Sequence, residues 1–235
     1  MTALHSPTPS PRSRCRAVDR LYPLAAVFAM IAALVMLAAP VQAAPEPAFQ
    51  AAFSAFQQAV ATKGEGGSAA AAAEQFDALL KAEPGNPLLM AYSGAATAML
   101  ANTTMLPWKK MSYAEDGLAQ IDKGLAMLQP VHDAPMQRGT PGSLETRFVA
   151  ASTFLKMPPM MNRGARGEKL LAEVQASQLM AQAPLGFKGA VWMAAARHAQ
   201  DEKQGDEARR LYAQVIASNA PQAEQAQAQL KSLAK

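Results

Sequence analysis

The chain has 235 residues, a formal net charge of +4, a hydrophobic fraction of one half and a single cysteine, Cys15. Four arginines and one aspartate lie within the first 43 residues, so the remainder has a net charge near +1. Such a remainder has no long-range attraction for nucleic acid or anionic lipid, and we expect neither as a partner. It also contains no thiol for a disulfide, a nucleophile or a soft metal ligand.

The first 43 residues have the pattern of a secretory signal peptide. An arginine-rich stretch over residues 12–20 precedes an apolar run over residues 24–39, and small residues stand at Val41 and Ala43, where signal peptidase reads the chain. We predict cleavage after Ala43 and secretion across the inner membrane into the periplasm. The alternative is an uncleaved anchor, because the apolar run approaches bilayer-spanning length, and only then do we expect membrane attachment.

After the leader, residues 44–235 show helical periodicity and no strand-like alternation. In chain order, helices are predicted over residues 47–62, 68–81, 87–101, 112–128, 143–156, 164–182, 187–200, 206–218 and 221–233. The third begins with Asn86 as its N-cap and Pro87 at its first position, and the fourth with Ser112 and Glu115 spaced as a capping box. Loops are expected over residues 102–111, 131–142 and 157–166. In the eighth helix, Asp206 and Arg210 are placed for an ion pair.

One spacing pattern occurs near both ends of residues 44–235. An aromatic residue is followed sixteen positions later by alanine and four positions after that by another aromatic, and a proline follows the alanine by about twelve positions. The first occurrence is Phe56, Ala72, Phe76 and Pro84, and the second is Trp192, Ala208, Tyr212 and, one position late, Pro221. Two helices pack closely where a small residue lets their backbones approach, so the pattern predicts helix pairs.

These helix pairs resemble the tetratricopeptide repeat. Residues 205–216 are similar to the second helix of that repeat, and residues 72–87 are similar to the same helix with its following turn. Gly94 in one middle helix and Gly117 in the next fit less closely, since the spacing between middle units exceeds one repeat. The resemblance implies an all-α, antiparallel helix-pair solenoid over residues 44–235, with 221–233 as a polar terminal cap. It also implies a surface that binds a peptide or a partner protein.

Two of the expected loops contain candidate partner-binding residues. They are Trp108, Lys109, Lys110, Met160, Met161 and Arg163. An exposed tryptophan and methionines beside cationic side chains would suit an acidic or amphipathic segment. The alternative is that Trp108 and the methionines fold back into the core. From this we predict a non-catalytic adaptor or scaffold of the cell envelope that needs no cofactor.

A second interpretation of the 157–166 loop is a Cu(I) site. Met157, Met160 and Met161, with Met136 as a fourth candidate, carry the soft thioether ligands that Cu(I) prefers.

Enzymatic motifs are missing from residues 44–235. His132 and His198 are not spaced as a metal-binding pair, and the sequence has no nucleophile elbow or phosphate-binding glycine loop. Glu115, Asp116 and Glu145 are interpreted as helix caps and helix-dipole partners. An enzyme built on carboxylates stays a third alternative.

Overall fold

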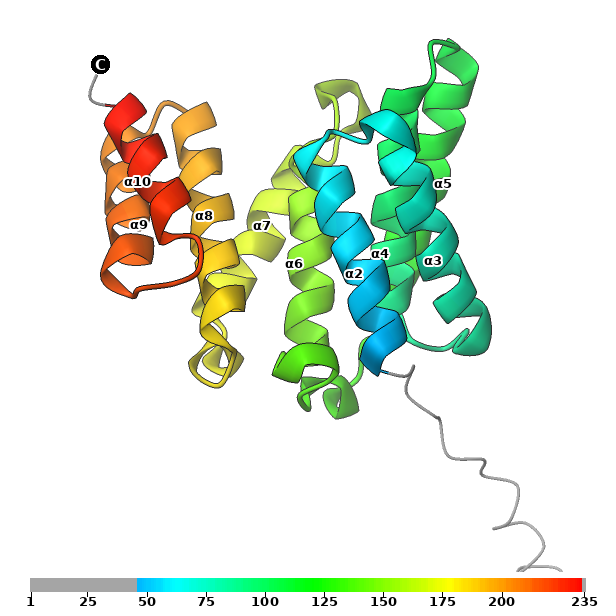
Figure 1. Cartoon of the computed structure of the whole chain (residues 1–235), viewed down its shortest axis with the longest axis horizontal. Coiled ribbons are helices and arrows are strands. Elements are labelled where there is room, and N and C mark those ends of the chain that lie inside the picture. Colours follow the sequence, from blue (N-terminus) through cyan, green and yellow to red (C-terminus); the bar gives the residue numbers. More distant parts are fainter. Residues whose placement is uncertain (1–45, 234–235) are drawn as a thin grey trace, which may run out of the picture. The chain divides into compact units, whose positions relative to one another are not determined.

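Helices make up the regular structure of residues 46–233, the part of the chain that the computed structural model describes (Figure 1). The α-helices of this part are α2 (Glu46–Ala61), α3 (Ser68–Ala82), α4 (Pro87–Met99), α5 (Pro107–Ala126), α6 (Gly142–Phe154), α7 (Gly164–Ala176), α8 (Leu185–Asp201), α9 (Gly205–Ala217) and α10 (Ala223–Ser232). Short 3₁₀ turns join several of them, and residues 46–233 contain no β-strand. The all-α class is therefore confirmed for this part. The predicted signal peptide, residues 1–43, lies outside the described residues.

The turn between α3 and α4 forms as its sequence predicts. The side chain of Asn86 accepts hydrogen bonds from the backbone N–H groups of Leu88 (3.0 Å) and Leu89 (3.3 Å). Pro87 occupies the first turn of α4, where its missing N–H costs no hydrogen bond. Asn86 also donates to the buried carboxylate of Glu83 (2.9 Å), which fixes the cap in place.

The start of α5 differs from the prediction. The helix begins at Pro107, so the second half of the expected loop 102–111 is helical and the capping-box prediction is wrong. Ser112 lies one full turn inside the helix and donates to Asp116 (3.1 Å) instead of capping the N-terminus. The reason is that Pro107 follows Leu106, an extended residue, and the fixed φ of proline already favours a helix start there.

Smaller corrections apply to three later predictions. The helix predicted over residues 164–182 ends at Ala176, because Ser177 caps a separate 3₁₀ turn over Gln178–Ala181. The predicted Asp206–Arg210 ion pair is wrong: Asp206 pairs with Arg209 (3.0 Å) and Arg210 with Glu207 (2.6 Å). The final helix begins at Ala223, two residues after Pro221.

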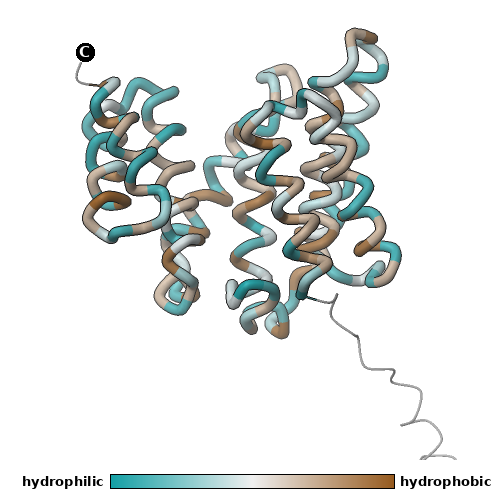
Figure 2. The backbone as a smooth tube through the Cα atoms, in the orientation of Figure 1, coloured by the Kyte–Doolittle hydropathy of each residue, from teal (hydrophilic) through white to brown (hydrophobic). Residues whose placement is uncertain are grey.

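Consecutive helices pack against each other along the chain. The main contacts join α2 with α3, α3 with α4, α4 with α5, α6 with α7, α8 with α9 and α9 with α10, and α4 also packs against α6. Helix α4 is buried along most of its length. Figure 2 shows hydrophobic and hydrophilic residues interleaved along the helices, as expected for helices that each bury one face. None of the helices within residues 46–233 is both long and apolar enough to cross a membrane.

Helices α4 and α5 approach each other closely at two glycines. A Cβ atom added to Gly94 of α4 would lie 2.5 Å from the carbonyl oxygen of Gly117 in α5, and one added to Gly117 would lie 2.7 Å from the backbone nitrogen of Ala98. Real Cβ atoms do not approach backbone atoms this closely, so both positions need glycine. This contact fixes the position of α5 and therefore of the residues that α5 presents to solvent.

The two alanines of the repeated spacing pattern lie inside helix contacts. Ala72 and Ala208 are fully buried, as are the aromatic residues Phe76 and Tyr212 that follow them by one turn. Of the other members, Phe56 and Trp192 are half-buried and packed against the core, and Pro84 is exposed in the α3–α4 turn. Small side chains thus lie where α3 and α9 pack against their neighbours.

Candidate functional site

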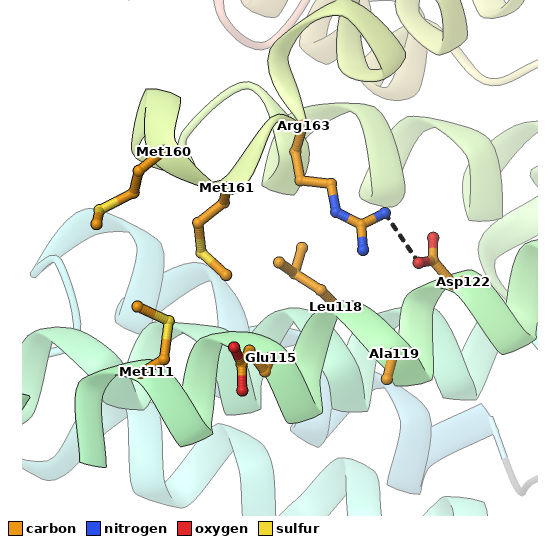
Figure 3. A pocket seen from close by; sticks show the side chains of 8 residues that line it. All are labelled: Met111, Glu115, Leu118, Ala119, Asp122, Met160, Met161 and Arg163. Carbon is orange, nitrogen blue, oxygen red and sulfur yellow. Dashed lines mark hydrogen bonds and ion pairs between the residues drawn. The ribbon is translucent and has the colours of Figure 1, made fainter. Parts of the chain in front are cut away.

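A groove of about 420 Å³ lies between α5 and the connection from α6 to α7 (Figure 3). The α5 side contributes Met111, Glu115, Leu118, Ala119 and Asp122, and the connection contributes Met160, Met161 and Arg163. We call these eight residues the methionine groove. The sequence-predicted residues Met160, Met161 and Arg163 are therefore brought together, and they meet a methionine of α5 that sequence reasoning did not select.

The α5 wall of the groove is one helix face that continues into solvent. Trp108, Met111, Glu115, Leu118 and Asp122 recur every three or four residues and so share a face. Leu118 is buried in the core, whereas the Trp108 side chain, nearly three turns nearer the N-terminus, is 67% exposed. The helix thus extends beyond the elements that cover it and presents a tryptophan next to the groove.

The other wall is held in a fixed conformation. The adjacent prolines Pro158 and Pro159 begin a 3₁₀ turn over Pro159–Met161, and Asn162 ends it in the left-handed region with a φ of 51°. Arg163 then donates to Asp122 of α5 (2.9 Å), and Arg166 donates to the other oxygen of the same carboxylate (2.5 Å). The ion pairs join the two walls of the methionine groove.

Exposed large hydrophobic side chains are concentrated at the start of α5. Eight such side chains are exposed within residues 46–233: Met105, Leu106, Trp108 and Met111 lie within seven consecutive residues, and Met160 lies across the groove from Met111. Met160 is 74% exposed. The other three stand singly at Val60, Val131 and Leu185. Scattered apolar residues are ordinary on a protein surface, whereas a group of them makes this region a candidate interaction site.

The proposed core-filling role of these residues holds only in part. Met157 and Met161 are half-buried and pack against the main core, whereas Trp108 and Met160 point to solvent. Met157 is not among the groove residues, and Met136 lies beside Gly142 at the opposite end of α6. Because α6 has 13 residues and is about 20 Å long, Met136 is remote from the groove.

Cationic side chains lie at the start of α5 and beside the methionine groove. Lys109 and Lys110 are exposed in the first turns of α5, and neither forms an ion pair within the described part of the chain. Arg163 and Arg166 share the single carboxylate of Asp122. Glu115 is the other acidic residue in the groove. A ligand with acidic side chains near an apolar segment would therefore match both the charge and the apolar surface of this region.

The chemically most unusual buried residue, Glu145, was interpreted from the sequence as a helix-end residue. Its carboxylate is fully buried in α6, accepts a hydrogen bond from the Tyr92 hydroxyl of α4 (2.6 Å) and pairs with Arg138 (2.5 Å). Burial raises the pKa of Glu145, although Arg138 opposes the shift, and burial raises the pKa of Tyr92 as well. The interpretation as a helix-dipole partner is therefore incomplete, because Glu145 mainly joins α4 to α6.

Arg138 completes this buried cluster. Its guanidinium carbon lies 3.5 Å from the ring centroid of Phe53 in α2, and its backbone has a φ of 59°. Tyr92 in turn packs against Phe53 and stacks on Phe76, with ring centroids 4.7 Å apart. The cluster thus links α2, α3, α4 and α6 and the turn at Gln137–Gly139, and this arrangement suits a structural role.

The two histidines within residues 46–233 have structural partners. The Nδ1 atom of His132 accepts a hydrogen bond from the backbone N–H of Gln129 (2.9 Å), and His198 Nε2 lies 3.7 Å from the carboxylate of Glu168. Within residues 46–233, no group of three or more His, Cys, Asp or Glu side chains is arranged to hold a metal ion. The chain matches no protein-family model, no curated protein and no solved structure.

Proposed function

We propose that the chain is an exported, tetratricopeptide-like adaptor that binds a segment of a partner protein in the cell envelope. Export is inferred from the arginine-rich and apolar leader, with the small residues Val41 and Ala43 before the expected cleavage site. The repeat-like architecture is supported by the buried alanines Ala72 and Ala208 and by consecutive packing of neighbouring helices. A solenoid of helix pairs would present such a binding surface on a rigid scaffold.

The observation that carries the proposal is the exposure of Met160 in the methionine groove and of Trp108 on α5, about one turn before the groove residue Met111. Exposed tryptophan is the side chain most often found at the energetic centre of protein interfaces, and methionine adapts to differently shaped apolar partners. The unpaired Lys109 and Lys110 specify the charge of the partner. The proposed occupant is therefore an amphipathic segment, with apolar side chains for the groove and acidic side chains for the lysines.

The test compares partner recovery by two triple variants. In the first, Trp108→Ala, Lys109→Ala and Lys110→Ala remove the anchor and both cations. In the second, a matched control, Lys81→Ala, Val131→Ala and Lys231→Ala remove the same number of exposed side chains elsewhere. Partners cross-linked in the native envelope and recovered with the wild type should be lost from the first variant only. Recovery of the same partners by a folded first variant would remove the groove from the proposal.

The carboxylate-dependent enzyme stays a prediction from the sequence. The two carboxylates of the methionine groove are Glu115 and Asp122, and Asp122 is occupied by its ion pairs with Arg163 and Arg166. Partner binding gives a role to the exposed apolar side chains Trp108 and Met160, whereas an enzyme that uses carboxylates would not.

A further inference from the structure

Three thioether side chains from two separate elements meet in the methionine groove. Met111 comes from α5, whereas Met160 and Met161 come from the turn at Pro159–Met161. Figure 3 shows Met111 and Met161 directed toward each other from the two walls, whereas Met160 extends toward the outer end of the groove. Met111 is far in the sequence from Met160 and Met161, so this grouping depends on the packing of α5 against the α6–α7 connection.

The chemistry of the groove favours a soft monovalent cation. Uncharged thioether sulfurs bind Cu(I) and similar soft ions in preference to hard divalent ions. Leu118 and Ala119 supply apolar lining, and Glu115 supplies a carboxylate. Asp122 offsets one of the two positive charges of Arg163 and Arg166, and Glu115 offsets the other, so the lining adds little net repulsion toward a cation.

Two of the three methionines are exposed to solvent, and two of the three lie on a fixed turn. Met160 is 74% exposed and Met111 is 39% exposed, so an ion can reach them from solvent. The turn that carries Met160 and Met161 is fixed at one end by Pro158 and Pro159 and at the other by the Arg163–Asp122 ion pair. A fixed turn reduces the entropy lost when the side chains gather around an ion.

We propose that Met111, Met160 and Met161 form a three-thioether site for Cu(I). This set differs from the one predicted from the sequence, because Met111 replaces Met157, which packs against the core. The site lies within the groove that the proposed adaptor function uses, but metal binding does not require a partner protein.

The experiment is a titration of the purified full-length protein with Ag(I), followed by Cu(I) in competition with a chromogenic chelator. All samples carry Cys15→Ser, because the thiol of Cys15 would compete for either ion. The protein should bind one equivalent, and the ¹³C methyl resonances of Met111, Met160 and Met161 should shift while those of the other methionines do not. Failure to form a stoichiometric complex, or shifts confined to other methionines, would overturn the site.

Variants at the methionines and at Trp108 separate this proposal from partner docking. Changing Met111, Met160 and Met161 together to leucine keeps the apolar side chains but removes the sulfurs, so metal binding should be abolished while the variant stays folded. Met105→Leu and Met157→Leu, which change methionines outside the groove, should bind the ion like the wild type. Metal binding that survives the triple change, or is lost in either control, would contradict the assignment. Trp108→Ala should have the opposite selectivity, with lost partner recovery and unchanged Ag(I) binding.

Discussion

Arg163 donates a 2.9 Å hydrogen bond to Asp122, and this ion pair joins the α6–α7 connection to α5 across the methionine groove. The same carboxylate accepts a second bond from Arg166. The guanidinium groups of both arginines lie over the ring of Phe154, with their central carbons 5.4 and 5.3 Å from its centroid. Asp122 therefore fixes two arginines that directly follow the turn at Pro159–Met161. These ion pairs hold that turn, which carries Met160 and Met161, against α5.

Asp122→Asn tests this support. The change removes the charge that both arginines share, and because the groups are only partly buried we expect a loss of about 1 kcal/mol in the free energy of unfolding. The matched control is Asp116→Asn, an exposed residue of the same helix that bonds only to Ser112, with an expected change within about 0.5 kcal/mol. Chemical denaturation measures both. Equal stability of the two variants would show that the ion pairs do not hold the groove.

Gly117→Ala should destabilise the protein although alanine is the better helix former. The added methyl group would meet the backbone of α4 at Ala98, and overpacking of this kind costs about 1–3 kcal/mol. The higher helix propensity of alanine increases the free energy of unfolding by at most about 1 kcal/mol. At Gly164, the first residue of α7, an added Cβ meets nothing within 4 Å, so Gly164→Ala should change stability by no more than about 0.5 kcal/mol. A Gly117→Ala variant as stable as the wild type would mean that α4 and α5 are not in backbone contact.

Glu145→Gln should change how stability depends on pH. Because burial raises the pKa of Glu145, the folded protein keeps a proton that the unfolded chain releases once the pH exceeds about 4.3, the ordinary glutamate value. Stability therefore falls as pH rises from that value to the raised pKa. Glutamine is neutral at every pH, so the Glu145→Gln variant does not lose stability in this range for this reason. Unfolding measured between pH 4 and pH 7 should show the wild type losing stability relative to the variant, and parallel curves would contradict the raised pKa.

The part of the fold that the sequence predicts well is governed by local chemistry. Asn86 and Pro87 specify a cap and a first helical residue without help from distant residues, and that turn forms as expected. The capping box at Ser112 and Glu115 failed because the same pattern also occurs inside helices, where serine can bond to a side chain one turn away. Pro107 was the stronger start signal.

The candidate site depends on long-range packing, and this limits its prediction from the sequence. Met160 and Met161 are neighbours in the chain and were selected together, but Met111 joins them only through tertiary contacts. Glu145 accepts a hydrogen bond from Tyr92, 53 residues away, so the sequence did not predict its burial either. One local signal was present: Glu145 precedes the buried Val149 by one helical turn and so lies on the inward face of α6.

The signal-peptide pattern of residues 1–43 predicts where the mature chain begins. If signal peptidase cuts after Ala43, mass spectrometry of the protein isolated from its native host will show a chain that begins at Ala44. A cut after Ala44 is disfavoured because Pro45 would then follow the scissile bond. Recovery of the chain with residues 1–43 intact would favour the uncleaved anchor and place the helical part at a membrane surface.

Photo-crosslinking from the methionine groove tests the adaptor proposal most directly. A photoreactive amino acid placed at Met160, which is 74% exposed, should cross-link in the native envelope to a defined partner segment with apolar and acidic residues. The matched position is Val131, which is 70% exposed in the turn at Pro130–Asp133 and should give no such product. The Met160 product should also disappear when Trp108 is changed to alanine. The same product from both positions, or none from Met160, would contradict partner binding in the groove.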